Sequence, residues 1–223
     1  ADGSAWDDHE IGVLRGAWPA SEQRDDLYGG AARDMLDGRG GSDRIYGGAG
    51  NDEGRGGDGD DLVCGNSGND TLFGDAGDDA LRGGDEDDAL FGGDGDDRLE
   101  GEGGDDLLDG GVGNDRLFGG NGNDVYRFAV GSGNDVIDAS AEGVGDVIEI
   151  GSGVSANDLA FRPAGAADWV ISLPGGSDTL TLSSWHTSAS RVTRVRFADG
   201  SQRDLAQRPG GPLLGTLAAD TIT

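Results

Sequence analysis

The most regular feature of the sequence is a large apolar residue that recurs at every ninth position between Gly29 and Arg127. It is the middle one of three residues, as Leu72 lies between Thr71 and Phe73, and the outer two point the other way. Such alternation predicts short β-strands with one buried face. The residues at this position are Leu36, Ile45, Val63, Leu72, Leu81, Leu90, Leu99, Leu108, Leu117 and Tyr126, and Gly54 interrupts the series.

The apolar positions belong to a nine-residue unit that is repeated eleven times without a gap. Every copy has Gly at its first position and Asp at its sixth. Glycine at positions one, two and four permits positive φ and close backbone approach, and Asn or Asp at position five tolerates the left-handed region. Each copy therefore reads as a six-residue turn followed by a strand. A period this strict predicts a solenoid in which one copy is one structural step.

If two copies make one turn of a flattened coil, the sixth-position aspartates stack in two rows. The odd-numbered copies give the first row, and the even-numbered copies give the second. Asp25, in the imperfect unit 20–28, is a possible extra member of the second row. The first row contains Asp34, Asp52, Asp70, Asp88, Asp106 and Asp124, and the second contains Asp43, Asp61, Asp79, Asp97 and Asp115.

These rows predict a calcium site between successive turns. Neighbouring strands lie about 4.8 Å apart, so stacked carboxylates repel one another unless a cation lies between them. Calcium accepts six to eight oxygen ligands, including backbone carbonyls, and tolerates irregular geometry. Roughly nine ions would fill the gaps of the two rows. Zinc is disfavoured because the sequence has no Cys/His cluster.

The unit resembles the nonapeptide GGxGxDxUx, with U a large apolar residue, of RTX (repeats-in-toxin) proteins. The resemblance covers the middle half of the chain and implies an all-β fold, a right-handed parallel β-roll with a β-rich C-terminal cap. It also implies that the sixth-position Asp bridges neighbouring ions and that turn carbonyls complete each shell. The glycines expected to supply those carbonyls are Gly48, Gly50, Gly57, Gly59, Gly68, Gly77, Gly93, Gly95, Gly104, Gly111, Gly113, Gly120 and Gly122.

A solvated acidic tract is the alternative interpretation, since Gly-rich and Asp-rich composition is also typical of disorder. Disorder does not require an apolar residue at the same position of every nine-residue copy, so the regular apolar series argues against this interpretation. The formal net charge of −28 nevertheless predicts that the chain repels itself without cations. Calcium binding would then supply folding free energy, so both interpretations apply, one without calcium and one with it. The first two copies carry Arg33 and Arg39 in their turns, and we expect that end to hold calcium poorly.

The sequence divides into four segments. Residues 1–19 read as the tail of a preceding flank, 20–127 as the roll, 128–208 as a β-rich capping flank, and 209–223 as a linker that begins another block. The strand-like runs 125–130, 146–150, 169–173, 178–182 and 192–197 belong to the cap or lead into it. VGSGNDVID at 130–138 is a phase-shifted half unit, which makes Asp135 a further candidate ligand. A cap is required because the last turn of a solenoid exposes apolar residues and an unpaired strand edge.

No catalytic motif is found, and the carboxylates recur with the repeat instead of gathering in one pocket. We expect a non-catalytic, secreted bacterial module that folds on calcium outside the cell. The resemblance implies a type I secretion channel as a partner during export, neighbouring RTX blocks of the same polypeptide, and presentation of a toxin or adhesin. The strong negative charge argues against nucleic acid. Cys64, at an outward ninth position, is expected to be a surface or half-buried thiol.

Two other functions stay open from the sequence. One is a receptor-binding or carbohydrate-binding module with its site in the flank, around Trp185 and His186. The other is a non-catalytic module of a secreted protease, lipase or polysaccharide-modifying enzyme whose catalytic domain lies outside this chain.

Overall fold

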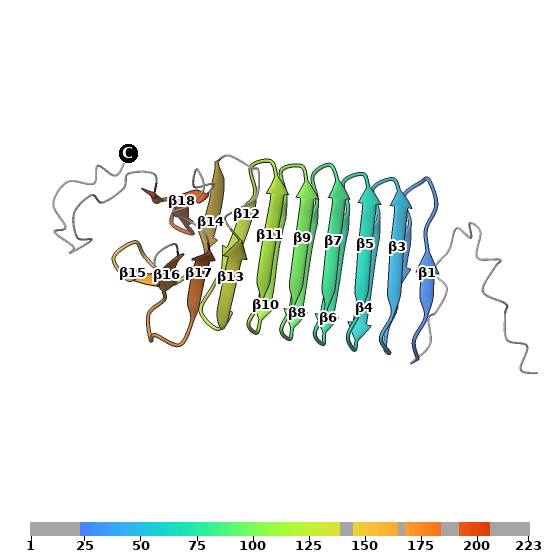
Figure 1. Cartoon of the computed structure of the whole chain (residues 1–223), viewed down its shortest axis with the longest axis horizontal. Coiled ribbons are helices and arrows are strands. Elements are labelled where there is room, and N and C mark those ends of the chain that lie inside the picture. The colour runs from blue at the N-terminus through green and yellow to red at the C-terminus, as the bar shows by residue number, and fades with distance from the viewer. Residues whose placement is uncertain (1–22, 139–144, 165–167, 184–191, 206–223) are drawn as a thin grey trace, which may run out of the picture.

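The protein is an elongated all-β solenoid with a β-rich cap at its C-terminal end (Figure 1). The computed structural model describes residues 23–138, 145–164, 168–183 and 192–205. Within these ranges there is no helix, and hence none that is long and apolar enough to cross a membrane. The segments 1–19 and 209–223, together with Trp185 and His186, lie outside the described residues.

The strands form two sheets, and from β1 to β14 odd-numbered and even-numbered strands alternate between them. The first sheet contains the odd strands of the roll, β1 (Asp26–Tyr28), β3 (Arg44–Ala49), β5 (Leu62–Ser67), β7 (Ala80–Asp85), β9 (Arg98–Gly103) and β11 (Arg116–Asn121), and then β13 (Asn134–Asp138) of the cap. The second contains the even strands of the roll, β2 (Met35–Asp37), β4 (Glu53–Asp58), β6 (Thr71–Ala76), β8 (Ala89–Asp94), β10 (Leu107–Val112) and β12 (Val125–Phe128), and then β14 (Asp146–Ile150) of the cap.

Strand pairing in the roll is parallel and keeps one register. Residue pairs within each sheet are separated by two copies of the repeat, as Leu72 pairs with Leu90 and Leu81 with Leu99. From β3 to β11 each strand spans positions seven to nine of one copy and one to three of the next. Positions four to six form the connecting turn, which is shorter than the six residues expected from the sequence. Two copies therefore make one turn of the coil, as the spacing predicted. Every side chain of a given position stacks on its counterpart one turn away.

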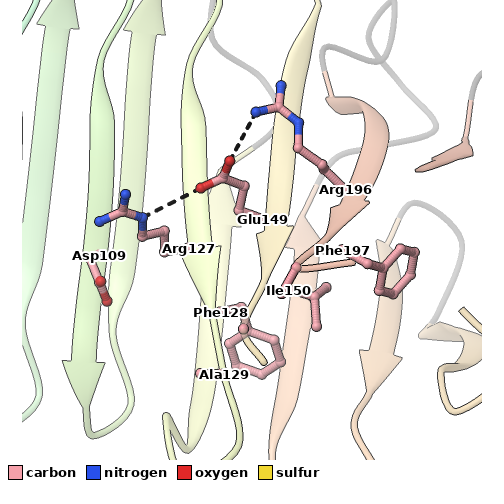
Figure 2. A pocket seen from close by; sticks show the side chains of 10 residues that line it. Asp109, Arg127, Phe128, Ala129, Glu149, Ile150, Arg196 and Phe197 are labelled. Carbon is pink, nitrogen blue, oxygen red and sulfur yellow. Dashed lines mark hydrogen bonds and ion pairs between the residues drawn. The ribbon is translucent and has the colours of Figure 1, made fainter. Parts of the chain in front are cut away.

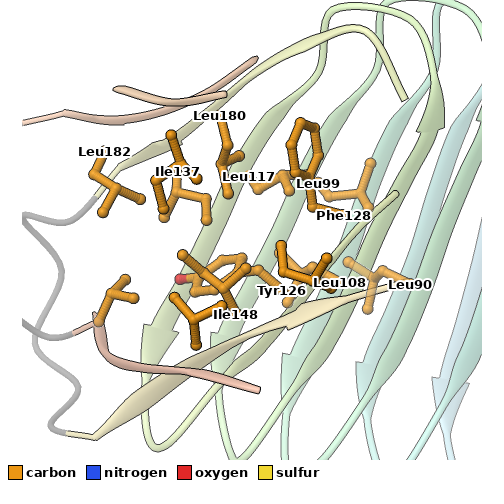
Figure 3. Packing of buried hydrophobic residues seen from close by; sticks show 14 of the residues in the cluster. Leu90, Leu99, Leu108, Leu117, Tyr126, Phe128, Ile137, Ile148, Leu180 and Leu182 are labelled. Carbon is orange, nitrogen blue, oxygen red and sulfur yellow. The ribbon is translucent and has the colours of Figure 1, made fainter. Parts of the chain in front are cut away.

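The position-eight side chains form the core of the roll, as predicted. Leu90, Leu108 and Tyr126 from the even sheet face Leu99 and Leu117 from the odd sheet (Figure 3). From Ile45 to Tyr126 these side chains are at most 1% exposed, and Gly54 is the position without one.

Gly54 does not leave an open gap in the core. A Cβ at Gly54 would lie 2.8 Å from Cγ1 of Val63 and 3.3 Å from Cδ2 of Leu72. The neighbouring side chains fill the place of the missing one.

The cap continues both sheets and then closes them with antiparallel strands. On the odd sheet β13 pairs in parallel with β17 (Thr179–Ser183), followed by antiparallel β16 (Asp168–Ser172) and β15 (Ala160–Ala164). On the even sheet β14 pairs in parallel with β18 (Val192–Phe197), followed by antiparallel β19 (Gln202–Asp204). The expected parallel roll with a β-rich cap is thus confirmed.

The thiol of Cys64 is more enclosed than the sequence suggested. The residue is 8% exposed, and burial raises the pKa of its thiol above the usual value. It lies on the outer side of β5 between Tyr46 and Arg82 of the adjacent strands. Because both neighbours are long side chains at the same outward position, they cover the small cysteine. Among the described residues it is not part of a disulfide.

Candidate metal centre

The sixth-position aspartates form the two rows that the repeat predicts. In each row the backbone N–H of one Asp donates to Oδ1 of the Asp on the next turn. In the first row Asp52 donates to Asp70 over 2.7 Å, and in the second Asp61 donates to Asp79 over 2.8 Å. The second row extends back to the N–H of Asp25, which donates to Asp43 over 2.7 Å. The carboxylates are therefore held in fixed orientation, one per turn.

The second carboxylate oxygen of these residues is buried and has no hydrogen-bond partner. This holds for Oδ2 of every sixth-position Asp from Asp43 to Asp124. A buried ionised carboxylate that lacks a partner is costly, so an array of such oxygens indicates a cation. Asp34, at the start of the first row, differs because its Oδ2 accepts the N–H of Gly30 over 2.6 Å.

The unpaired oxygens lie inside the turns, next to backbone carbonyls. A Cβ added to Gly56 would collide both with Oδ2 of Asp61 in the same copy and with the carbonyl oxygen of Gly74 on the next turn. The same pair of atoms surrounds the first glycine of copy after copy, from Gly38 to Gly101. This explains the invariant first glycine, since a side chain would fill the space in which carboxylate and carbonyl oxygens meet. The first-position carbonyls are thus candidate ligands that sequence reasoning missed.

The turn glycines named from the sequence have the conformation that the repeat requires. All of them, from Gly48 to Gly122, have positive φ, and so do Gly41 and Gly84, which were not named. Five other residues adopt the same conformation where the repeat lacks glycine at position two or four, namely Arg39, Asn66, Asp75, Glu86 and Glu102. In the first copy Gly30 and Ala32 do not. That copy departs from the regular turn, in line with the weak N-terminal end that the sequence predicts.

Backbone oxygens are needed to complete any metal shell in this roll. Within the described residues no point gathers three or more His, Cys, Asp or Glu side chains that could hold a metal ion. The row geometry instead offers carboxylate oxygens from successive turns together with carbonyl oxygens from the same turns. Such a donor set consists of hard oxygen atoms, which suits Ca²⁺ and is unsuited to Zn²⁺.

Burial raises the pKa of the row aspartates from Asp61 to Asp124 above the usual value of 3.8. Desolvation is the largest cause, and nearby carboxylates add to it. The pKa of Asp88 and of Asp97 rises to about 8, and that of Asp79 and of Asp106 to about 7. In the folded, metal-free roll these carboxylates therefore favour the protonated form, and a divalent cation would compete with the protons.

Both rows continue into the cap. The N–H of Asp115 donates to Oδ1 of Asp135 over 3.1 Å, which places this phase-shifted candidate at the end of the second row. The N–H of Asp124 donates to Oδ1 of Asp146, also over 3.1 Å, at the end of the first row. Asp146 is 4% exposed and was missed from the sequence. The spacing grows from 18 residues to 20 and 22 at these steps, so a fixed period could not find it.

On the outer face, a groove of about 350 Å³ lies where the even sheet passes from roll to cap. Figure 2 shows Glu149 between Arg127 and Arg196, on the neighbouring strands β12 and β18. Arg196 Nη1 lies 2.9 Å from Glu149 Oε1, and Arg127 Nε lies 3.4 Å from Oε2. These ion pairs lie across the seam between roll and cap and are distinct from the buried carboxylate rows.

Comparison with known proteins agrees with this geometry. The family model described as RTX calcium-binding nonapeptide repeat (4 copies) matches residues 20–54, 55–90 and 91–126. A second model, the haemolysin-type calcium binding protein related domain, matches residues 168–207 in the cap. The chain thus contains a calcium-binding β-roll module. More particularly, residues 20–126 are a block of RTX calcium-binding nonapeptide repeats, followed by a haemolysin-type related segment.

The solved structures include a crystal structure of the extracellular lipase LipA from Serratia marcescens. It has 19% sequence identity and a TM-score of 0.34, over 78% of this chain. The alignment spans 38% of the length of the lipase chain. No curated protein matches the chain in a sequence search.

Proposed function

We propose that this chain is a non-catalytic folding module of a secreted bacterial protein, unfolded at low calcium and rigid at the millimolar calcium outside the cell. The observation that carries the proposal is the array of buried Oδ2 atoms without partners, from Asp43 to Asp124. Without a cation these carboxylates oppose folding, and with one they join successive turns. Extracellular calcium modules typically have dissociation constants of about 10⁻⁴ to 10⁻³ M. With such affinities the folding midpoint would lie between the calcium concentrations inside and outside the cell.

The proposed ligands are the row aspartates from Asp34 to Asp124, with Asp135 at the cap and the carbonyls of the turn glycines. The roll would occupy residues 20–127 and its cap residues 128–208. An expanded chain inside the cell can be threaded through a type I secretion channel, whereas a rigid roll outside can present a toxin or adhesin segment of the same polypeptide. The haemolysin-type repeats support this assignment, since such repeats are typical of secreted proteins.

The experiment is a calcium titration followed by far-UV circular dichroism and hydrodynamic radius, with magnesium as the control. The expected result is cooperative compaction with a growing β-signal at submillimolar to millimolar calcium. Magnesium should fail because it demands near-ideal octahedral geometry and gives up its water reluctantly. Near neutral pH, a chain that is compact without calcium, or expanded in millimolar calcium, would overturn the proposal.

A further inference from the structure

Tyr126 is the position-eight residue of the last copy and the only one in the series with a polar atom. Its ring is 1% exposed and lies in the core row with Leu108 and Ile148 (Figure 3). The hydroxyl accepts the backbone N–H of Gly119 over 3.0 Å. A hydrophobic ladder does not need this oxygen, so its position requires a separate explanation.

The Tyr126 hydroxyl lies beside the first glycine of its copy, the position that a carbonyl oxygen approaches in earlier copies. At the first glycine of earlier copies, Oδ2 of the same copy's Asp and a carbonyl oxygen of the next turn approach one point. At Gly119 the atoms that meet this point are Oδ2 of Asp124 and the hydroxyl oxygen of Tyr126. At Gly110, the corresponding last turn of the other row, the three nearest atoms all belong to Asp115. The two rows therefore end differently.

The cap supplies the next carboxylate of the same row. Oδ1 of Asp146 accepts the N–H of Asp124, as each Asp of the roll does for its predecessor. Asp124 is 0% exposed, and its Oδ2 has no hydrogen-bond partner. A buried carboxylate oxygen without a partner, a phenol oxygen and a second row carboxylate are thus gathered at the seam between roll and cap.

We propose that Asp124, Asp146 and Tyr126 form a junction calcium site, in which a single ion connects the last turn of the roll to the cap. The two aspartates supply the negative charge, and the Tyr126 hydroxyl supplies the neutral oxygen that a glycine carbonyl supplies elsewhere. Calcium accepts such mixed sets of hard oxygen ligands. The inference rests on the proposed calcium-dependent folding of the roll, and it adds that cap docking and binding of the last ion are one event.

The test compares Asp146→Asn and Tyr126→Phe with wild type, using the whole chain. Asp146→Asn removes one carboxylate oxygen at nearly constant shape, and Tyr126→Phe removes only the hydroxyl. The matched controls are Asp94→Asn, an exposed residue at the end of β8, and Tyr46→Phe, on the outer face of β3. Bound calcium is counted by equilibrium dialysis, and docking of the cap is followed by hydrogen exchange of β14 and β18.

Asp146→Asn should bind one calcium ion fewer than wild type and expose β14 and β18 to exchange while the middle of the roll stays protected. Tyr126→Phe should raise the dissociation constant of the last ion roughly twofold to tenfold, since it loses one neutral oxygen contact. Both controls should match wild type. Unchanged stoichiometry, affinity and exchange in both variants would overturn the junction site.

The outcomes also separate this inference from the proposed function. If wild type itself does not compact with calcium, the proposed function fails. If wild type folds with calcium and both variants behave identically to it, only the junction site fails. If Asp146→Asn does not fold at any calcium concentration, the test rests on Tyr126→Phe. An unchanged dissociation constant of the last ion in that variant would overturn the junction site.

Discussion

The backbone N–H of Asp79 donates a hydrogen bond of 2.8 Å to Oδ1 of Asp97, one turn further along the roll. Oδ2 of both residues is buried without a partner. In each carboxylate one oxygen therefore fixes the stacking of turns, and the other is free of hydrogen bonds. In the proposed calcium site, stacking and metal binding depend on the same side chain, so the loss of one would weaken the other.

Replacement of Asp79 by Asn should raise the calcium concentration at the folding midpoint roughly tenfold or more. The amide keeps an oxygen for the N–H of Asp61. It removes the negative charge, however, and places an N–H₂ group where the proposed ligand oxygen lies. Loss of a group that supports a metal site lowers metal affinity by roughly tenfold or more. Circular dichroism during calcium titration measures the midpoint. Asp94→Asn makes the same change at an exposed position at the end of β8 and should leave the midpoint unchanged. Equal midpoints for the two variants would contradict the role of the row.

The metal-free chain should be more folded at pH 5.5 than at pH 8.5. The pKa of Asp97 rises from 3.8 to about 8 in the folded roll, so the folded form binds the proton more tightly than the unfolded chain. This contribution is complete below about pH 3.8 and is lost as the pH rises through 8. Circular dichroism in a chelator at both pH values tests it.

Calcium binding at pH 5.5 should also release protons, because the row carboxylates that the folded metal-free roll holds protonated must ionise to bind it. Calorimetry of calcium binding in two buffers with different ionisation enthalpies measures the release. A heat that is independent of the buffer would show that the row is already ionised.

Truncation of a ladder residue should destabilise the calcium-loaded roll strongly. Leu90 is 0% exposed. Leu90→Ala should lower the free energy of unfolding by about 2 to 5 kcal/mol, the range for buried leucines that leave a cavity. Met35 is 62% exposed at the outer face of β2, and Met35→Ala should have little effect. Denaturant unfolding at fixed calcium gives both values. Similar losses would mean that the apolar ladder is not the core.

Replacement of Glu102 by glycine should stabilise the roll, because Glu102 is an exposed position-two residue of β9 with φ of 75°. A left-handed conformation costs a residue with a Cβ about 1 to 2 kcal/mol, so Glu102→Gly should raise stability by about 1 kcal/mol. The reverse change, Gly93→Glu at a position-two glycine with φ of 122°, should lower it. Thermal unfolding at fixed calcium compares the two. A lower stability of Glu102→Gly would indicate that the Glu102 carboxylate itself stabilises the roll.

The sequence by itself determined the repeat, the two aspartate rows, the apolar ladder and the calcium-binding character. These features follow from local rules, because a fixed period of nine places like residues on one line in any solenoid. The same regularity predicted the positive φ of the turn glycines, since those positions need a backbone without Cβ.

Only the tertiary structure decided how the regular roll ends. Asp146 joins the first row although 22 residues separate it from Asp124. The Tyr126 hydroxyl bonds Gly119 within the same turn. Val63 and Leu72 close over Gly54, and Tyr46 and Arg82 lie on either side of Cys64. These relationships depend on how irregular loops and neighbouring side chains pack in space, and a periodic pattern carries no information on either.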